Sequence, residues 1–452
     1  MQERQRLGSR LGFILLSAGC AIGVGNVWKF PFVTGQNGGG AFVFLYIIFL
    51  IILGVPVMTM EFAVGRKAQK SPVLMYQQIE KPGQKWHWHG YACLAGSVVL
   101  MIFYTTVAGW ILYYLKASVT GELFGLSASQ VGEAFNQTVA SPQKTVICMI
   151  IVCVLASVVL SFSLQGGLEK ITKVMMLALL VLMIVLAVHG LTLEGAGEAV
   201  SFYLKPDFGK ITPGVVVSAM NQAFFTLSLG IGSMAIFGSY IDKSRSLMGE
   251  SLNVIVLDTF VAIVAGLIIF PACFTYNVEV TAGPSLLFVA LPNVFNCMPM
   301  GRLWGTLFFL FMFFAAFSTV TAVLEALFSG VRELTGWSRR KAAAVCGICV
   351  AILSLPCALG FNVLSWIQPF GEGSTIMDVE DFIVSNCLLP LGSMIFVLFC
   401  TWKSGWGFDN FLEEANAGKG LKFPRGIKGY VKYVMPVIIL VIFVIGVIDF
   451  FG

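Results

Sequence analysis

Glycine and polar residues interrupt the first apolar stretch of the chain, where freed backbone groups are able to bind an ion or a charged solute. Residues 10–31 read RLGFILLSAGCAIGVGNVWKFP, so a glycine-rich run ends in Asn26 and is followed by Lys29. Each glycine costs a helix about 1 kcal/mol relative to alanine. Backbone released from a helix is tolerated at membrane depth only where protein or a water-filled cavity satisfies it. We expect a broken membrane helix with a binding site at the break; a glycine-rich packing face is the alternative.

A second apolar stretch carries the same kind of interruption. Residues 221–232 read NQAFFTLSLGIG, in which polar side chains are followed by a Gly-x-Gly like that of Gly23 and Gly25. Five membrane spans separate the starts of the two interruptions, and an odd offset inverts the second unit relative to the first. Paired, glycine-interrupted spans in two inverted halves indicate the midplane binding site of a transporter. Two unrelated packing faces are the alternative.

Other spans hold polar side chains at membrane depth. Opposite the first break, the adjacent hydroxyls of Ser318 and Thr319 would add oxygen ligands for a small hard cation, although such hydroxyls often bond to carbonyls of their own helix. An ionised Asp258 costs at least ~2.5 kcal/mol inside a bilayer and is therefore a functional candidate; a structural partner for freed amides is its alternative. We interpret Glu61 and Glu325 as structural partners of this kind.

Membrane helices must position these residues. The chain of 452 residues is 58% hydrophobic and 11% charged, with a mean hydropathy of +0.88, which indicates an integral membrane protein. Basic residues flank the apolar stretches, so the net charge of +5 does not indicate a nucleic-acid partner. Eleven stretches are long enough to cross a bilayer, which takes about 20 residues each; they lie near 11–35, 40–65, 89–116, 145–163, 168–189, 213–240, 251–275, 302–333, 340–358, 376–401 and 430–451.

The distribution of lysine and arginine predicts the orientation in the membrane. Of the 28 basic residues, 22 lie in segments on the side of the N-terminus and five on the other side, while Lys29 lies within a span. We expect a multi-pass protein of the plasma (inner) membrane, with a cytoplasmic N-terminus and an extracellular C-terminus.

Cysteine and histidine residues do not indicate a catalytic or metal site. Most of the eleven cysteines lie in apolar spans, where they behave as small hydrophobic residues; Cys346 and Cys349 are interpreted as packing. His87, His89 and Cys93 stand beside two tryptophans at a helix entry, so we prefer an interfacial aromatic belt to a metal site. His89 stands at a helix entry and His189 at a span end, so no histidine lies in the interior of a span, which argues against an intramembrane enzyme.

Taken together, these residues resemble the neurotransmitter:sodium symporter family, and within it the prokaryotic LeuT-like amino-acid transporters. The matching stretches run in order along the chain: 10–31, 37–42 (NGGGAF), 61–66 (EFAVGR), 224–230, and Ser318 with Thr319. The resemblance implies an all-α polytopic membrane protein with a LeuT-like 5+5 inverted-repeat bundle plus one further helix, in which helices 1 and 6 are unwound at mid-membrane. Members usually have twelve helices, whereas this chain is of an eleven-helix type.

The implied organisation divides the chain into five segments. Residues 1–10 are a cytoplasmic N-terminal segment, and residues 11–189 form the first five-helix repeat. Residues 190–212 are an extracellular loop, residues 213–401 form the second, inverted repeat, and residues 402–452 are a cytoplasmic loop and the eleventh helix.

By the resemblance, two sodium ions bind at the breaks. The first site uses the substrate carboxylate, one carbonyl and three side chains, from Ala21 and from Asn26, Thr226 and Asp258. The second site uses three carbonyls and two hydroxyls, from Gly19, Ile22 and Ala315 and from Ser318 and Thr319. Because the substrate completes one ion site, sodium and amino acid should bind with positive coupling.

The resemblance also assigns the contacts of the amino acid. Its carboxylate meets the amides of Val24 and Gly25 and the hydroxyl of Tyr104, since half-helix N-termini stabilise anions. Its ammonium group meets the carbonyls of Ala21, Phe225 and Thr226, and its side chain lies among Cys20, Leu100, Tyr104, Phe225, Ser228, Ile231, Thr319 and Val323. Glycine at position 23, where monoamine transporters carry Asp, favours a substrate with its own carboxylate.

Two gates are implied, and the sequence departs from the family at some of their positions. The extracellular gate is formed by Lys29, Asp381 and Gln222, and the intracellular gate by Arg4, Glu333 and Tyr240. Lys29 replaces a usual Arg, which removes a forked pairing with Asp381. Three further departures are Leu7 for Trp, Leu177 for Pro and Asp258 for Asn. Ala262 stands where chloride-dependent members have Ser, so we expect the fixed carboxylate of Asp258 to make chloride unnecessary.

The function implied by the resemblance is sodium-coupled symport of a neutral, hydrophobic or aromatic amino acid into the cell by alternating access. The expected partners are the amino acid, two co-transported sodium ions and the lipid bilayer, and the oligomeric state stays open. A non-transporting amino-acid sensor of the same fold is the alternative. A proton-coupled relative is a further one, against which the hydroxyls of Ser318 and Thr319 argue.

Overall fold

The computed structural model describes residues 7–277 and 286–451, and the structural statements below concern these residues. Every regular element in them is a helix. The elements up to residue 191 are α1 (Arg10–Ala21), η1 (Gly25–Lys29), α2 (Phe30–Gln36), α3 (Gly40–Phe49), η2 (Leu50–Gly54), α4 (Val55–Ala68), α5 (Pro72–Ile79), α6 (His87–Thr120), α7 (Ala128–Val139), α8 (Pro142–Ser161), η3 (Leu164–Glu169) and α9 (Lys170–Leu191).

The remaining elements begin with two short helices, α10 (Ala196–Leu204) and η4 (Phe208–Lys210). They continue with α11 (Pro213–Thr226), α12 (Ser233–Gly238), α13 (Leu247–Thr275), η5 (Leu286–Ala290), α14 (Leu291–Cys297), α15 (Gly301–Thr335), α16 (Arg339–Leu353), α17 (Leu355–Leu359), α18 (Ile376–Asp381), η6 (Phe382–Leu388), α19 (Leu389–Thr401), α20 (Phe408–Ala415), η7 (Arg425–Ile427), η8 (Tyr430–Val434) and α21 (Met435–Phe451).

Both predicted helix breaks are confirmed. α1 ends at Ala21, and the helical piece that starts at Gly25 is bent by 57° relative to it. α11 ends at Thr226 and α12 begins at Ser233, so the second break covers residues 227–232. In this break the backbone takes positive φ angles of 49° at Ser228, 99° at Gly230 and 75° at Gly232, a region that only glycine enters without steric cost.

The number of membrane-spanning helices depends on how the broken ones are treated. Among the described residues, nine helices are long and apolar enough to cross a membrane, and ten if the bent pair around the first break is one span. The predicted span 213–240 consists of α11 and α12, which are short pieces of 14 and 6 residues. It therefore reaches span length only if both pieces are combined across the second break.

The longest helices form the centre of the bundle. α6 and α15 pack against each other and against α8, and α1 packs against α15, α13 and α9. In the most apolar 18 residues of α15, 78% of the residues are buried. In the corresponding stretch of Leu164–Leu191, which comprises η3 and α9, only 33% are buried, so this helix leaves an apolar face outward. A helix that exposes apolar residues on the outside of such a bundle is expected to face lipid.

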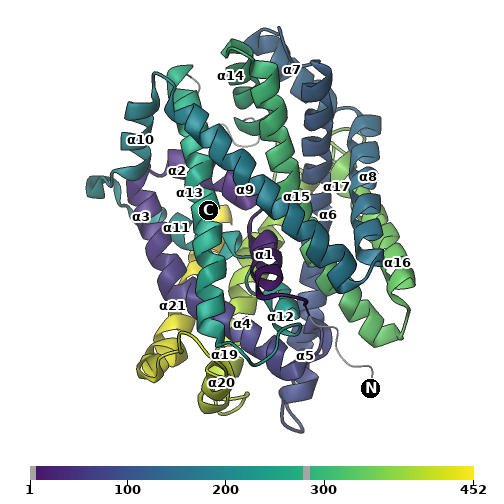
Figure 1. Ribbon diagram of the computed structural model, residues 1–452, viewed down its shortest axis with the longest axis vertical. Coiled ribbons are helices and arrows are strands. Elements are labelled where there is room, and N and C mark those ends of the chain that lie inside the picture. Colours follow the sequence, from purple (N-terminus) through teal and green to yellow (C-terminus); the bar gives the residue numbers. More distant parts are fainter. Residues whose placement is uncertain (1–6, 278–285, 452) are drawn as a thin grey trace.

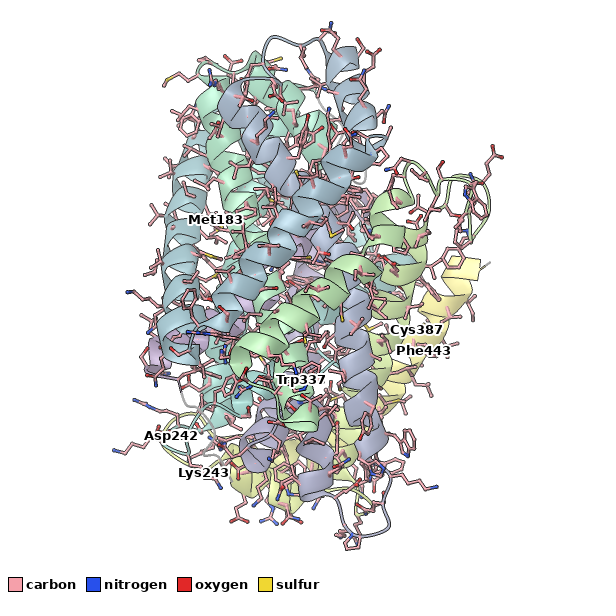
Figure 2. All side chains as sticks on the ribbon, turned by 90° about the vertical axis from the view of Figure 1, so that its right-hand side faces the viewer. Met183, Asp242, Lys243, Trp337, Cys387 and Phe443 are labelled. Atoms are coloured by element: carbon pink, nitrogen blue, oxygen red, sulfur yellow. The ribbon has the colours of Figure 1, made fainter. Side chains whose placement is uncertain are left out.

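Short helices cover both ends of the bundle. Figure 1 shows α7, α10 and α14 at its upper end and α5 and α20 at its lower end, while α1 ends inside the bundle. Figure 2 shows the neighbouring charged residues Asp242 and Lys243 at the lower end, whereas Met183 lies between the two ends. Charged residues at one end and an apolar residue between the two ends fit a protein that crosses a bilayer.

The starts of the helices that flank the site follow ordinary capping rules. The hydroxyl of Ser9 accepts a hydrogen bond from the amide of Gly12 at the start of α1. Thr212 caps α11 in the same way, and Pro213 occupies the first turn. Such caps satisfy amides that have no partner within the helix, so they fix where the two broken helices begin.

Candidate functional site

The hydroxyl of Thr319 on α15 lies between two carbonyl oxygens at the first break and one of its own helix. It is 3.3 Å from the oxygen of Gly19, 3.2 Å from that of Ile22 and 3.4 Å from that of Ala315. The neighbouring hydroxyl of Ser318 lies 2.9 Å from the same Ala315 oxygen. A hydroxyl donates only one hydrogen at a time, so more acceptors converge here than two hydroxyls can satisfy. Five oxygens in this arrangement suit a hard cation such as sodium.

A buried carboxylate lies at the other side of the first break. Asp258 on α13 is fully buried; its Oδ1 accepts from the side-chain amide of Asn26 over 2.8 Å and its Oδ2 from the hydroxyl of Thr226 over 3.1 Å. The Asn26 oxygen in turn accepts from the amide of Gly23 over 3.1 Å. These contacts of the carboxylate come from neutral groups, and a buried charge requires a counter-charge or a metal ion. The arrangement therefore fits a cation beside Asp258.

One residue beside this carboxylate was missed by the sequence analysis. Tyr46 on α3 is fully buried, and its hydroxyl lies near Thr226 and Asp258 without a hydrogen-bond partner among the described residues. Its ring packs on Phe30 with centroids 4.7 Å apart. A tyrosine inside the otherwise apolar sequence GAFVFLYIIF was the available signal, because a buried hydroxyl usually has a polar partner.

A small cavity lies between the two breaks. Its volume is about 20 Å³, and its lining includes Leu389 of α19, which the sequence analysis missed, together with Ala21, Gly23, Gly25, Leu100, Tyr104, Phe225, Thr226, Ser228 and Thr319. Of the predicted substrate residues, four lie outside this lining: Cys20, Val24, Ile231 and Val323. Val24 is linked to the lining through a hydrogen bond, which its amide donates to the Tyr104 hydroxyl over 3.0 Å.

The glycines of the first break are required by close contacts. A Cβ atom at Gly23 would lie 2.3 Å from the hydroxyl oxygen of Tyr104 and 2.6 Å from that of Thr319. A Cβ at Gly25 would lie 2.8 Å from the Phe225 ring. Any side chain at either position would therefore displace a residue that lines the cavity.

A cation and an aromatic ring close one side of the cavity. The ammonium group of Lys29 lies 3.6 Å from Asp381 and 3.8 Å from the centre of the Phe225 ring. The side-chain amide of Gln222 donates to the carbonyl of Gly25 over 3.2 Å. The three predicted residues of the extracellular gate thus lie around one side of the first break.

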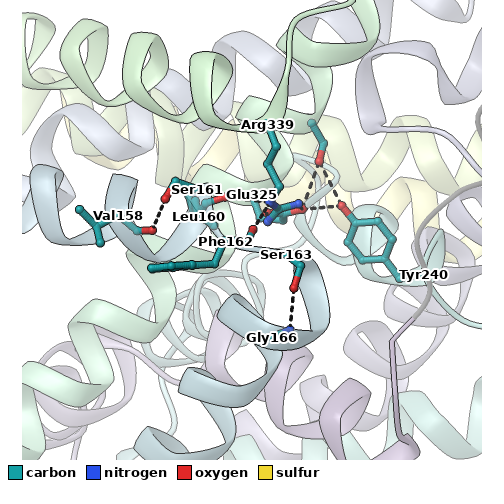
Figure 3. Close-up of polar contacts among 10 residues, drawn as sticks. Val158, Leu160, Ser161, Phe162, Ser163, Gly166, Tyr240, Glu325 and Arg339 are labelled. Carbon is teal, nitrogen blue, oxygen red and sulfur yellow. Dashed lines mark hydrogen bonds and ion pairs between the residues drawn. The ribbon is translucent and has the colours of Figure 1, made fainter.

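On the opposite side, Tyr240 belongs to a buried network centred on Glu325. The Tyr240 hydroxyl donates to Glu325 over 2.7 Å, and the guanidinium of Arg339 approaches the same carboxylate to 2.9 Å (Figure 3). Arg339 also donates to the carbonyls of Leu160 and Phe162 at the end of α8. The sequence alone does not indicate this role of Arg339, because its position beside Glu325 depends on how α16 packs on α15.

The predicted intracellular gate is only partly described. Arg4 lies outside the described residues. Glu333 accepts hydrogen bonds from the amide and the hydroxyl of Ser71, the shortest over 2.6 Å. Glu169 on η3 accepts from the amide of Gly8 over 2.7 Å, which holds the residues before α1 against η3.

The interpretation of His87, His89 and Cys93 as an interfacial belt is wrong for two of them. His89 is only 7% exposed and Cys93 only 1%, so both point into the bundle, whereas Trp88 is 66% exposed. His87 instead pairs with Glu80 over 2.6 Å at the start of α6. His89 and Cys93 lie one helical turn apart and so on the same face of α6. Sequence periodicity does not indicate this face, because the whole span is apolar.

Comparison with known proteins places the chain in a family. Residues 4–146 and 128–451 match the model of the sodium:neurotransmitter symporter family. An uncharacterized sodium-dependent transporter of Bacillus subtilis, YhdH, is 34% identical over 99% of both chains, and the sodium-dependent serotonin transporter of Drosophila melanogaster is 26% identical over 99% of this chain and 77% of the other. The crystal structure of MhsT in complex with L-phenylalanine is similar with a TM-score of 0.89 and 36% identity, covering 98% of this chain and 99% of that one.

These matches agree with the fold and with the arrangement at the breaks. The chain has the LeuT-like fold and is a sodium-dependent membrane transporter. It belongs to the sodium:neurotransmitter symporter family, whose members are sodium-coupled transporters and not enzymes.

Proposed function

We propose that the chain carries a neutral, hydrophobic or aromatic amino acid into the cell together with two sodium ions. The main support for this proposal is the set of oxygen atoms around the first break. Carbonyls that have lost their helical partners face the hydroxyl of Thr319 on one side, and the buried carboxylate of Asp258 lies on the other. The oxygens near Thr319 and those near Asp258 each provide the oxygen ligands that one sodium ion requires.

The second sodium ion is assigned to the carbonyls near Thr319. Three carbonyl oxygens and two hydroxyl oxygens would bind it without any formal charge. A neutral set of oxygen ligands favours a monovalent over a divalent cation, because the ligands do not offset a second positive charge. The ion would also join α1 to α15, so its release would free the two helices to separate.

The first sodium ion is assigned to the space beside Asp258, with Asn26 and Thr226 as further ligands. The substrate carboxylate would complete this site. An amino acid therefore increases the affinity for this ion, and the ion increases the affinity for the amino acid by the same factor. A chloride ion is not needed, because Asp258 already supplies a fixed negative charge.

The amino acid is assigned to the cavity between the breaks. The cavity offers the Tyr104 hydroxyl and the start of the helical piece after the first break to a carboxylate. Leu100, Phe225 and Leu389 give it apolar walls, and the similar structure of MhsT contains L-phenylalanine. Its present volume of about 20 Å³ holds about one water molecule, so the walls must move apart to admit an amino acid.

Closure on both sides supports transport by alternating access. Lys29, Asp381 and Phe225 close one side, and the network of Tyr240, Glu325 and Arg339 joins helices on the other. Opening one set of contacts at a time would expose the cavity to one side of the membrane only. We assign the Lys29 side to the outside, since this orientation places most basic residues in the cytoplasm.

Uptake by the purified protein in liposomes tests this function. With sodium outside and potassium inside, labelled L-phenylalanine should accumulate above its equilibrium level, and collapse of the sodium gradient by an ionophore should release it. Sodium-dependent binding without accumulation would mean a sensor. Accumulation driven equally well by a proton gradient without sodium would mean a proton-coupled carrier.

A further inference from the structure

A stripe of residues on α6 follows the second helix break. His89, Cys93, Gly96 and Leu100 are spaced by four, three and four positions, so they lie on one face of the helix. Leu100 lines the cavity between the breaks. Cys93 and Gly96 lie against residues 230–232 of the second break, and the His89 imidazole lies beside the Cys93 sulfur.

The peptide groups of Gly230 are held from two directions. Its amide donates to Glu61 on α4 over 2.5 Å. Its carbonyl oxygen faces α6, where the sulfur of Cys93 lies 3.8 Å away, and Nε2 of His89 lies 3.8 Å from that same sulfur. A buried carbonyl outside a helix lacks the amide that would otherwise satisfy it, so these groups on α6 replace a missing backbone partner.

The orientation of the His89 ring is fixed by Tyr76 on α5. The Tyr76 hydroxyl lies 2.7 Å from Nδ1 of His89, and the two rings meet edge to face with centroids 5.3 Å apart. The ring of Phe396 on α19 meets the imidazole at 5.2 Å. If Tyr76 donates to Nδ1, the neutral ring carries its proton on Nε2, the nitrogen that lies 3.8 Å from the Cys93 sulfur beside the Gly230 carbonyl.

Close packing connects Gly230 to the wall of the cavity. A Cβ atom at Gly392 would lie 2.1 Å from the Gly230 oxygen, so this carbonyl has little room on the side of α19. Ile231, the next residue, packs on α6, because a Cβ at Gly96 would lie 3.0 Å from its side chain. A shift of the Gly230 carbonyl would therefore move Ile231 against Gly96, which lies one helical turn before Leu100, a residue that lines the cavity.

We propose that His89 is a positioning residue which holds the Gly230 carbonyl and thereby sets the size of amino-acid side chain that the transporter accepts. This inference rests on the proposed function. His89 does not touch the substrate; it acts through Gly230 and Ile231. The two variants that separate this role from simple core packing are His89→Gln, which keeps a donor and an acceptor, and His89→Leu, which keeps the volume and loses both.

The test compares binding of L-tryptophan, L-phenylalanine, L-leucine and L-alanine in sodium. His89→Leu should change the ratio of the dissociation constants for tryptophan and alanine by about tenfold or more, while His89→Gln should stay within about threefold of the wild type. His87→Gln is the matched control, since His87 pairs with Glu80 away from the break. If His89→Leu weakens all four amino acids by one common factor, His89 only packs and the proposal is wrong.

Two further measurements keep the inference testable by itself. Amide hydrogen exchange is measured in sodium without any amino acid. Relative to the wild type, His89→Leu should exchange faster in residues 227–232 and at the same rate in residues 10–21. An equal change in the two stretches contradicts the proposal, whether or not the proposed substrate class is right. If His89→Leu does not fold, Tyr76→Phe decides. It removes the group that orients the ring, so a changed size preference supports the proposal and an unchanged one overturns it.

Discussion

The side-chain amide of Asn26 donates a hydrogen bond of 2.8 Å to the carboxylate of Asp258. Asn26 follows the first helix break, whereas Asp258 lies in the middle of α13. The contact joins the break to a neighbouring helix and brings a buried negative charge to the point where carbonyls are free. The neutral partners of this charge are the reason to expect a cation there.

Replacement of Asp258 should remove sodium dependence. Asp258→Ala deletes the charge and both oxygens, so sodium-dependent uptake of L-phenylalanine should be lost. Asp258→Asn keeps one oxygen and should raise the sodium concentration for half-maximal uptake by about tenfold or more, since the ion loses its buried counter-charge. Sodium titrations of uptake measure both effects. An unchanged titration curve in Asp258→Ala would remove this residue from the ion site.

Chloride should not be required. Ala262 lies one helical turn after Asp258 on α13, and a methyl group cannot bind an anion there. Replacement of chloride by gluconate on both sides of the membrane should leave the uptake rate unchanged within about twofold. A collapse of uptake in gluconate would show that the Asp258 carboxylate does not replace a chloride ion.

The hydroxyl of Thr319 should contribute to sodium affinity. Thr319→Val preserves the shape and removes one ligand, so half-maximal uptake should require about tenfold more sodium. Thr321→Val is the matched control, because Thr321 is equally buried on α15 but donates to the carbonyls of Phe317 and Ser318 in its own helix. Equal effects of the two substitutions would mean that only helix packing is disturbed.

A side chain at Gly23 should block the cavity. In Gly23→Ala the new Cβ would lie 2.3 Å from the Tyr104 hydroxyl, so amino-acid affinity should fall by about 100-fold or more. Gly197→Ala is a control with open space around the new atom. Calorimetric binding of L-phenylalanine in sodium measures the loss. Retained affinity in Gly23→Ala would place the substrate away from this break.

The helix breaks could be predicted because their causes are local. Glycine and amide residues within an apolar stretch are visible in the sequence, and the same stretch must satisfy its freed backbone. The boundaries are less predictable: of the interrupted run 221–232, residues 221–226 remain in α11, and the second break starts at Leu227. Thr226 accommodates a helical conformation while its hydroxyl points to Asp258, so a polar residue near a break need not lie inside it.

Contacts between distant helices were the part that the sequence did not reveal. Leu389 lines the cavity and Arg339 pairs with Glu325, but neither residue differs locally from many other leucines and arginines at helix ends. His89 was assigned to the membrane interface, since its neighbours are tryptophans and a single sequence carries no signal for the helix face. Pair contacts of this kind follow from packing, which the periodicity of a uniformly apolar helix does not define.

The most direct test of the account is equilibrium binding of labelled L-phenylalanine to the purified protein at constant ionic strength, with sodium exchanged for potassium. The account predicts at least about tenfold tighter binding in sodium, and an increase of sodium affinity by the same factor when the amino acid is present. Equal binding in sodium and potassium would contradict the central claim that the two helix breaks hold the ions and the amino acid together.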